Sequence, residues 1–237
     1  MKSTLKIILL FSLLALSFGG VKIAKSTRSK KAVKKCTPIL KKEFKKKGLE
    51  WGSNIYFRVF KQEKQLEVWV KKNKKFTLFK IYKICYFSGG LGTKTKQGDG
   101  KSPEGFYYLK TNSMNPYSSY HLSFNIGYPN KYERQKKYTG SALMVHGNCV
   151  SIGCYAMGNK NIEEIYTLLE SSFEHNQGLV RIHIFPFKFT NNKMKNRVIV
   201  SNKWFSFWKN LREGYDFFEK NKTPPNVEVV GGKYVFN

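Results

Sequence analysis

Hydrophobic and polar residues alternate along several short stretches of the chain. These stretches are rich in β-branched and aromatic residues, which is typical of strands with one buried face. The predicted strands cover residues 54–60, 65–70, 75–87, 106–109, 120–128, 140–147 and 179–189. A glycine-rich segment, residues 88–105, separates the first three strands from the others. It is predicted to be a substrate lid or a simple series of turns.

Two other stretches have a helical period. In residues 161–173 the apolar positions share one face. They are Ile162, Ile165, Tyr166, Leu169 and Phe173. Asn161 can cap the start of this helix. A second, aromatic helix is predicted over residues 203–220, and it ends before two prolines, which cannot continue it. The pattern predicts a mostly β, α+β fold in a single domain.

Composition supports a folded chain. Its 237 residues suit one domain with small additions, and 41% hydrophobic and 16% aromatic residues exclude a disordered protein. The charge is strongly basic, with 43 Lys and Arg against 15 Asp and Glu. Such a field attracts nucleic acid, anionic membranes or wall polymers, and charge alone does not choose among them.

The N-terminus predicts export. Lys2 and Lys6 precede an apolar run over residues 7–18, and Ser17 and Gly19 are small residues at the positions that a signal peptidase recognises. The run is shorter than the ~20 residues that span a bilayer. We therefore expect a signal peptide over residues 1–19, with an uncleaved anchor as the alternative. Export argues against a nucleic-acid partner.

Residues 20–50 form a basic segment. Twelve Lys or Arg and one acid, Glu43, lie between Lys22 and Lys47. A solvated linker is the favoured interpretation. The alternative is a helix that begins near Ile39 and docks on the domain through Leu40 and Phe44. The domain proper is expected over residues 51–237.

The densest chemistry lies in "HGNCVSIGC", residues 146–154. A zinc site needs about four ligands and usually paired spacings, which this stretch lacks. A disulfide between Cys149 and Cys154 is possible, but it would consume the better nucleophile. A thiol beside an imidazole, His146, could instead attack a carbonyl. The residues alone leave the choice open between this site and buried residues without a catalytic role.

This stretch resembles the signature of the L,D-transpeptidase catalytic domain, the YkuD-like family. That signature is His-Gly followed by Ser-x-Gly-Cys. Two departures, the short spacing from His146 to Cys154 and Ile152 in place of His or Arg, match the YafK-like murein enzymes of Gram-negative envelopes. The resemblance extends over about residues 51–236, through "GDGKSPEGFYYL", "YHLSFNIGYPN", "VRIHIFPFKF" and the C-terminal tail. It implies the YkuD-like β-sandwich or barrel-like catalytic domain.

The resemblance also implies residue roles. Cys154 would attack a carbonyl of a peptidoglycan stem peptide and form a thioester, and His146 would be base and then acid. Gly153, with the Cys154 amide, would bind the oxyanion, and Ser151 and Gly147 would shape the site. No metal or cofactor is expected. The expected partners are stem peptides and a wall-attached lipoprotein, acted on by a monomer in the periplasm.

Several expectations remain beside this hypothesis. An amine acceptor would give transpeptidation and water would give hydrolysis, and both share one thioester. The alternative function is a catalytically idle cationic envelope protein that binds anionic wall polymer. His121 is expected to contact substrate or to be a hydrogen-bonded strand residue. We expect Cys85 in the core, Cys149 as a bystander in its loop, and His183 half-buried in a strand.

Overall fold

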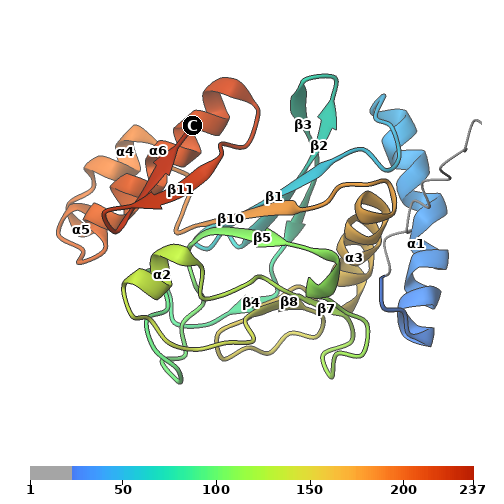
Figure 1. Cartoon of the computed structure of the whole chain (residues 1–237), viewed down its shortest axis with the longest axis horizontal. Helices are drawn as coiled ribbons and strands as arrows, with labels where there is room; N and C mark the ends of the chain where they lie inside the picture. The colour runs from blue at the N-terminus through green and yellow to red at the C-terminus, as the bar shows by residue number, and fades with distance from the viewer. Residues whose placement is uncertain (1–22) are drawn as a thin grey trace, which may run out of the picture.

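The structure is a computed structural model, and it describes residues 23–237 (Figure 1). The signal-peptide prediction for residues 1–19 lies outside the described residues. Two five-stranded sheets form the centre of the molecule, and helices flank them at both ends (Figure 1). This mixed α+β architecture confirms the predicted fold class.

The first sheet has the strand order β3-β2-β1-β10-β5. Its strands are β1 (Ile55–Phe60), β2 (Gln65–Lys72), β3 (Lys75–Lys83), β5 (Gly105–Leu109) and β10 (Val180–Phe185). The strands β1 and β10 run parallel and the other neighbours run antiparallel. All six residues of β1 are buried, as is usual for a central strand covered on both faces.

The second sheet has the order β4-β9-β8-β7-β6 and contains short strands. They are β4 (Tyr86–Phe87), β6 (Met114–Asn115), β7 (Ser123–Asn125), β8 (Met144–His146) and β9 (Tyr155–Ala156). The pair β8 and β9 runs parallel, so the "HGNCVSIGC" stretch begins at the last residue of β8 and ends just before β9. This sheet therefore carries the candidate chemistry.

The helices are α1 (Thr27–Lys46), the 3-10 turn η1 (Thr111–Ser113), α2 (Lys131–Gln135), α3 (Asn159–Glu174), α4 (Asn191–Lys195), α5 (Arg197–Val200) and α6 (Phe205–Asn221). A hairpin of β11 (Val227–Val230) and β12 (Lys233–Phe236) closes the described chain beside α6. The helix α3 begins after Gly158, so the predicted cap is wrong: Asn161 lies inside the helix and donates to Lys83 O instead.

The favoured interpretation of the basic segment as a solvated linker is wrong for α1. Ala32, Cys36, Leu40 and Phe44 recur every fourth residue and are buried in the main core. The helix lies along α3 (Figure 1). The lysines of α1 are exposed. Within residues 23–237, no helix is both long and apolar enough to cross a membrane.

The core has two parts. One joins both sheets with α1 and α3, and the other is an aromatic cluster under α6. In the second cluster Trp208 is fully buried, so the aromatic run at the start of α6 serves packing. His183 lies in the core beneath it, bonded to Tyr56 Oη, and it is fully buried rather than half-buried.

Candidate active site

The pairing of β8 with β9 places Cys154 next to the strand that carries His146. The parallel pair aligns Val145 with Tyr155 and His146 with Ala156. Aligned residues of neighbouring strands point the same way, and orientation alternates along each strand. His146 and Ala156 therefore face away from Val145 and Tyr155, and Cys154 lies in the bend just before β9, where its Sγ accepts from Met144 N of β8.

The His146 ring is held in one tautomer. Its Nδ1 lies 2.6 Å from Gly147 O, and a carbonyl oxygen only accepts, so Nδ1 carries the proton. This leaves Nε2 as a proton acceptor. The Tyr120 ring packs against the imidazole, with centroids 4.7 Å apart. Burial lowers the pKa of His146, although the Gly147 carbonyl opposes the change, so the ring is neutral at neutral pH.

Cys154 is a free, partly buried thiol. The Met144 N–H donates to its Sγ at 3.4 Å, and Sγ lies 3.8 Å from Ala142 O. Burial raises the pKa of the thiol, and the Met144 amide and the Lys94 charge oppose that change. The resting pair is therefore a neutral thiol and a neutral imidazole. A nucleophilic reaction at this site needs the imidazole as a base.

Glycine is required at position 147 because atoms of neighbouring residues lie very close to its backbone. A Cβ at this position would lie 2.7 Å from Tyr120 O and 2.8 Å from both His121 Cβ and Asn159 Oδ1. Its N–H bridges Tyr120 O and Leu122 O. The glycine thus lets the loop before β7 pack directly against the histidine backbone, and it fixes the carbonyl that orients His146.

Ser151 braces the turn before Cys154. Its Oγ donates to Cys154 O at 2.8 Å and accepts from Gly153 N at 3.0 Å. Gly153 has a φ of 148°, which favours glycine. The Gly153 amide is therefore occupied at rest, and it must leave Ser151 Oγ before it can bind an oxyanion.

Cys149 forms a disulfide with Cys85. Two expectations are wrong here: Cys85 is exposed rather than in the core, and Cys149 is not a bystander. The possible pairing of Cys149 with Cys154 is also not formed. Cys85 follows the long strand β3 and its N–H donates to Ala156 O, which places it at the edge of β9. The disulfide ties down the loop between His146 and Cys154 and leaves the thiol of Cys154 free.

A buried ion pair anchors the glycine-rich segment beside Cys154. Lys61 Nζ donates to Glu104 Oε1 at 3.0 Å and to the carbonyls of Gly92 and Ser102, and neither charged side chain is exposed. Trp208 Nε1 donates to the second oxygen of Glu104. Burial lowers the pKa of Lys61, and Glu104 opposes that change. These bonds fix the glycine-rich segment as one wall of the candidate site. Ser102 Oγ of this segment donates to Cys154 O.

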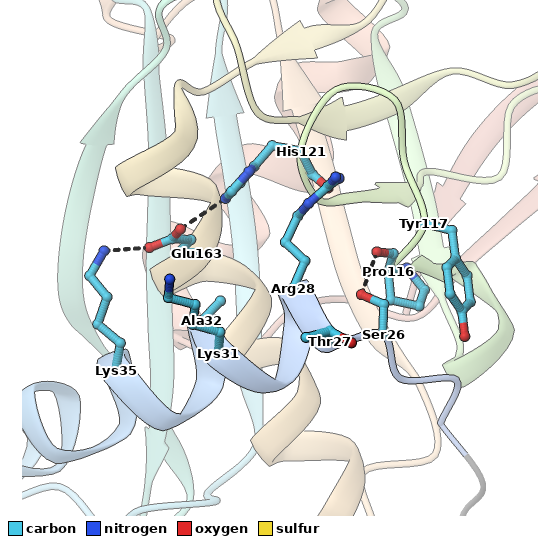
Figure 2. Close-up of a pocket in the computed structure, with 10 residues that line it drawn as sticks. All are labelled: Ser26, Thr27, Arg28, Lys31, Ala32, Lys35, Pro116, Tyr117, His121 and Glu163. Carbon is cyan, nitrogen blue, oxygen red and sulfur yellow. Dashed lines mark hydrogen bonds and ion pairs between the residues drawn. The ribbon is translucent and has the colours of Figure 1, made fainter.

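His121 lines a cavity of about 820 Å³ between α1 and residues 116–121 (Figure 2). Its Nε2 lies 2.8 Å from Glu163 Oε1 of α3, and Lys35 Nζ lies 2.6 Å from the other oxygen. Arg28 Nη1 donates to Ser118 O and His121 O. His121 is therefore hydrogen-bonded and also faces a cavity, one residue from the Tyr120 ring on His146.

Sequence reasoning missed some neighbours of the site. Tyr120, Lys61 and Arg28 are brought close by folding, and no local motif marks them. Ile152 is 90% exposed and Val150 is 57% exposed, so the short loop that carries the disulfide presents apolar side chains to solvent beside Cys154. Among the described residues, no group of three His, Cys, Asp or Glu side chains could hold a metal ion.

Comparison with known proteins places this geometry in a family. The family model described as "L,D-transpeptidase catalytic domain" (YkuD) matches residues 54–200. The chain is 45% identical over 199 residues to YafK of Escherichia coli (strain K12), whose assignment as an L,D-transpeptidase is provisional. The alignment covers 84% of this chain and 79% of that protein.

Two solved structures align with the chain at low sequence identity. The helical cell shape determining protein Pgp2 from Campylobacter jejuni aligns at 18% identity with a TM-score of 0.46, over 81% of this chain and 80% of that one. Bdellovibrio bacteriovorus Bd1075 aligns at 19% identity with a TM-score of 0.41, over 70% and 56%. On the family model and the YafK alignment, the chain belongs to the L,D-transpeptidase catalytic domain (YkuD) family.

Proposed function

We propose that the protein is a periplasmic cysteine enzyme that modifies peptidoglycan through an acyl-enzyme on Cys154. The observation that supports the proposal is the contact of Cys154 Sγ with Met144 N of β8, the strand that ends at His146, together with the hydrogen bond from Nδ1 of the imidazole to Gly147 O. Family membership supports peptidoglycan as the substrate class.

The first half of the proposed reaction forms a thioester. His146 Nε2 takes the thiol proton as Sγ attacks a stem-peptide carbonyl, and the carbonyl oxygen becomes an oxyanion. The Cys154 amide and, once it leaves Ser151 Oγ, the Gly153 amide supply hydrogen bonds to that oxyanion. The C–N bond then breaks, and the imidazolium gives its proton to the leaving amine.

The second half releases the enzyme. An amine or a water molecule attacks the thioester while His146 Nε2 takes its proton, and the C–S bond breaks as the thiolate recovers that proton. An amine acceptor yields a cross-link or protein attachment, and water yields release of an attached lipoprotein. Both outcomes use the same catalytic groups, Cys154 and His146, and the same thioester. The proposal therefore concerns the thioester, and the reaction products identify the acceptor.

Mass spectrometry of peptidoglycan incubated with the full chain tests this proposal. New tetrapeptide cross-links indicate transpeptidation, and loss of attached lipoprotein without new cross-links indicates hydrolysis. Cys154→Ala should abolish either change. The matched control is Cys36→Ala, since Cys36 is the other free cysteine in the described chain and is buried in α1. Unchanged peptidoglycan with the wild-type enzyme would count against the proposal.

The charge of α1 supports a second candidate function, a catalytically idle protein that binds anionic wall polymer. The helix carries nine Lys or Arg and one acid. This candidate predicts binding to wall polymer that survives Cys154→Ala and weakens steeply with salt, while no thioester forms. Turnover that depends on Cys154 would exclude it.

A further inference from the structure

The cavity in Figure 2 has an excess of positive charge. Arg28, Lys31 and Lys35 of α1 line it, and among the described residues of its lining Glu163 is the only carboxylate. That carboxylate already has two partners, Lys35 on one oxygen and His121 on the other. The acid therefore leaves two of the three α1 cations uncompensated.

Of the α1 cations in this lining, Lys31 makes the fewest polar contacts. Its ammonium forms no hydrogen bond or ion pair with any residue in the described part of the chain. Arg28, in contrast, uses Nη1 to hold the carbonyls of Ser118 and His121. Lys31 is thus an exposed ammonium in the lining of a concave site, available to an anionic ligand.

The cavity also adjoins the proposed catalytic pair. His121 lines the cavity, and its Cβ is so close to Gly147 that a side chain there would clash. The preceding residue, Tyr120, packs on the His146 ring. A ligand in the cavity would therefore lie one layer of side chains away from the imidazole. The size of about 820 Å³ is within the range of small-ligand sites.

We propose that this cavity is a subsite for a free carboxylate of the stem peptide, bound by the Lys31 ammonium, with the exposed Tyr117 ring at its rim. The inference rests on the proposed function, which supplies the peptide class. It also gives α1 a role in substrate selection, although α1 lies outside the region matched by the family model. A peptide carboxylate matches the ammonium in charge and hydrogen bonding.

Binding to the full chain bearing Cys154→Ala tests the subsite without turnover. Two synthetic stem peptides serve as probes, one with free carboxylates and one with every carboxylate amidated. Isothermal titration should show roughly three- to tenfold tighter binding of the free-carboxylate peptide. Adding Lys31→Ala should remove this preference. Adding Lys34→Ala instead should preserve it, because Lys34 is an exposed lysine of α1 outside the cavity lining.

Three results would overturn the subsite. They are an unchanged preference in Lys31→Ala, an equal loss in Lys34→Ala, which indicates diffuse attraction by the whole helix, and no measurable binding of either peptide. Melting temperature and iodoacetamide labelling of Cys154 in the Cys154-containing Lys31→Ala chain check that the fold and the pair are intact. A preference that depends on Lys31 in an enzyme that never acylates Cys154 would refute the proposed function and leave the subsite standing.

Discussion

The two walls beside the Cys154 and His146 pair are held in different ways. The glycine-rich segment on the Cys154 side is anchored by the fully buried Lys61 and Glu104 pair. Residues 116–121, on the His146 side, are held by hydrogen bonds from α1, such as those that Arg28 donates to backbone carbonyls. The first wall belongs to the family domain, whereas the second depends on a helix that the family model does not cover.

The difference indicates a division of roles. A buried charge pair is costly to break, so the glycine-rich wall should keep one position throughout the reaction. Partly exposed polar bonds contribute much less to stability. Substitutions of the polar α1 side chains at this wall should therefore alter substrate preference with little effect on the free energy of unfolding.

Breaking the buried anchor should have the largest effect. Lys61→Met leaves the Glu104 carboxylate buried without its cation, and we expect the free energy of unfolding to fall by about 3–5 kcal/mol. Chemical denaturation measures this. Lys83→Met, at an exposed lysine of β3, should change it by less than about 0.5 kcal/mol. Similar small losses in both variants would contradict the assignment of Lys61 as an anchor.

Removing the disulfide should have the next largest effect. Cys85→Ser combined with Cys149→Ser releases a link across 64 residues, and we expect a loss of about 2–4 kcal/mol in unfolding free energy. Because the loop between His146 and Cys154 is also released, the rate of thioester formation should fall. Reduction of the wild type should reproduce both effects, and reduction should leave the double variant unchanged. A fully active, equally stable double variant would contradict this role.

The structure shows why these anchors escaped the sequence analysis. The alternating pattern located β1 and β10, but it did not indicate that two strands more than 100 residues apart pair in parallel. The partner of Cys149 was missed for the same reason, since Cys85 lies in a different predicted strand. Buried residues recur at every fourth position of α1. The many lysines and Pro38 within the helix made this helical period difficult to recognise in the sequence.

The site itself was more accessible to prediction because its central groups lie within nine residues. The motif named Cys154, His146, Ser151, Gly147 and Gly153, which lie at the end of β8 and in the loop between β8 and β9. What the motif could not supply is their environment. The Tyr120 ring and the Met144 amide contact the pair only after the sheet has formed.

The acid limb of the pH–rate profile tests whether neutral His146 is the base. Burial lowers the pKa of His146 from 6.5, and a protonated imidazole cannot accept the thiol proton. The value of kcat/KM should therefore be steady near neutral pH and fall as pH drops through a value below 6.5. A limb in the alkaline range, set by the raised thiol pKa of Cys154, would contradict a histidine base.

Loosening the α1 wall should have the smallest effect. Arg28→Ala removes two bonds to the segment that carries Tyr120, so we expect kcat to fall about three- to tenfold through a less well-placed His146. The melting temperature should change little. Lys34→Ala on the same helix should leave kcat unchanged. Equal kcat values in Arg28→Ala and the wild type would show that α1 does not support the active site.

The most direct test of the central claim is intact and peptide mass spectrometry of the enzyme quenched during reaction with stem peptides. We predict a covalent acyl adduct on Cys154, absent in Cys154→Ala and formed far more slowly in His146→Gln. Cys36 should remain unmodified, and Cys85 and Cys149 should remain joined. Turnover of the peptide with no adduct on Cys154, or with equal acylation rates in His146→Gln and the wild type, would contradict the account.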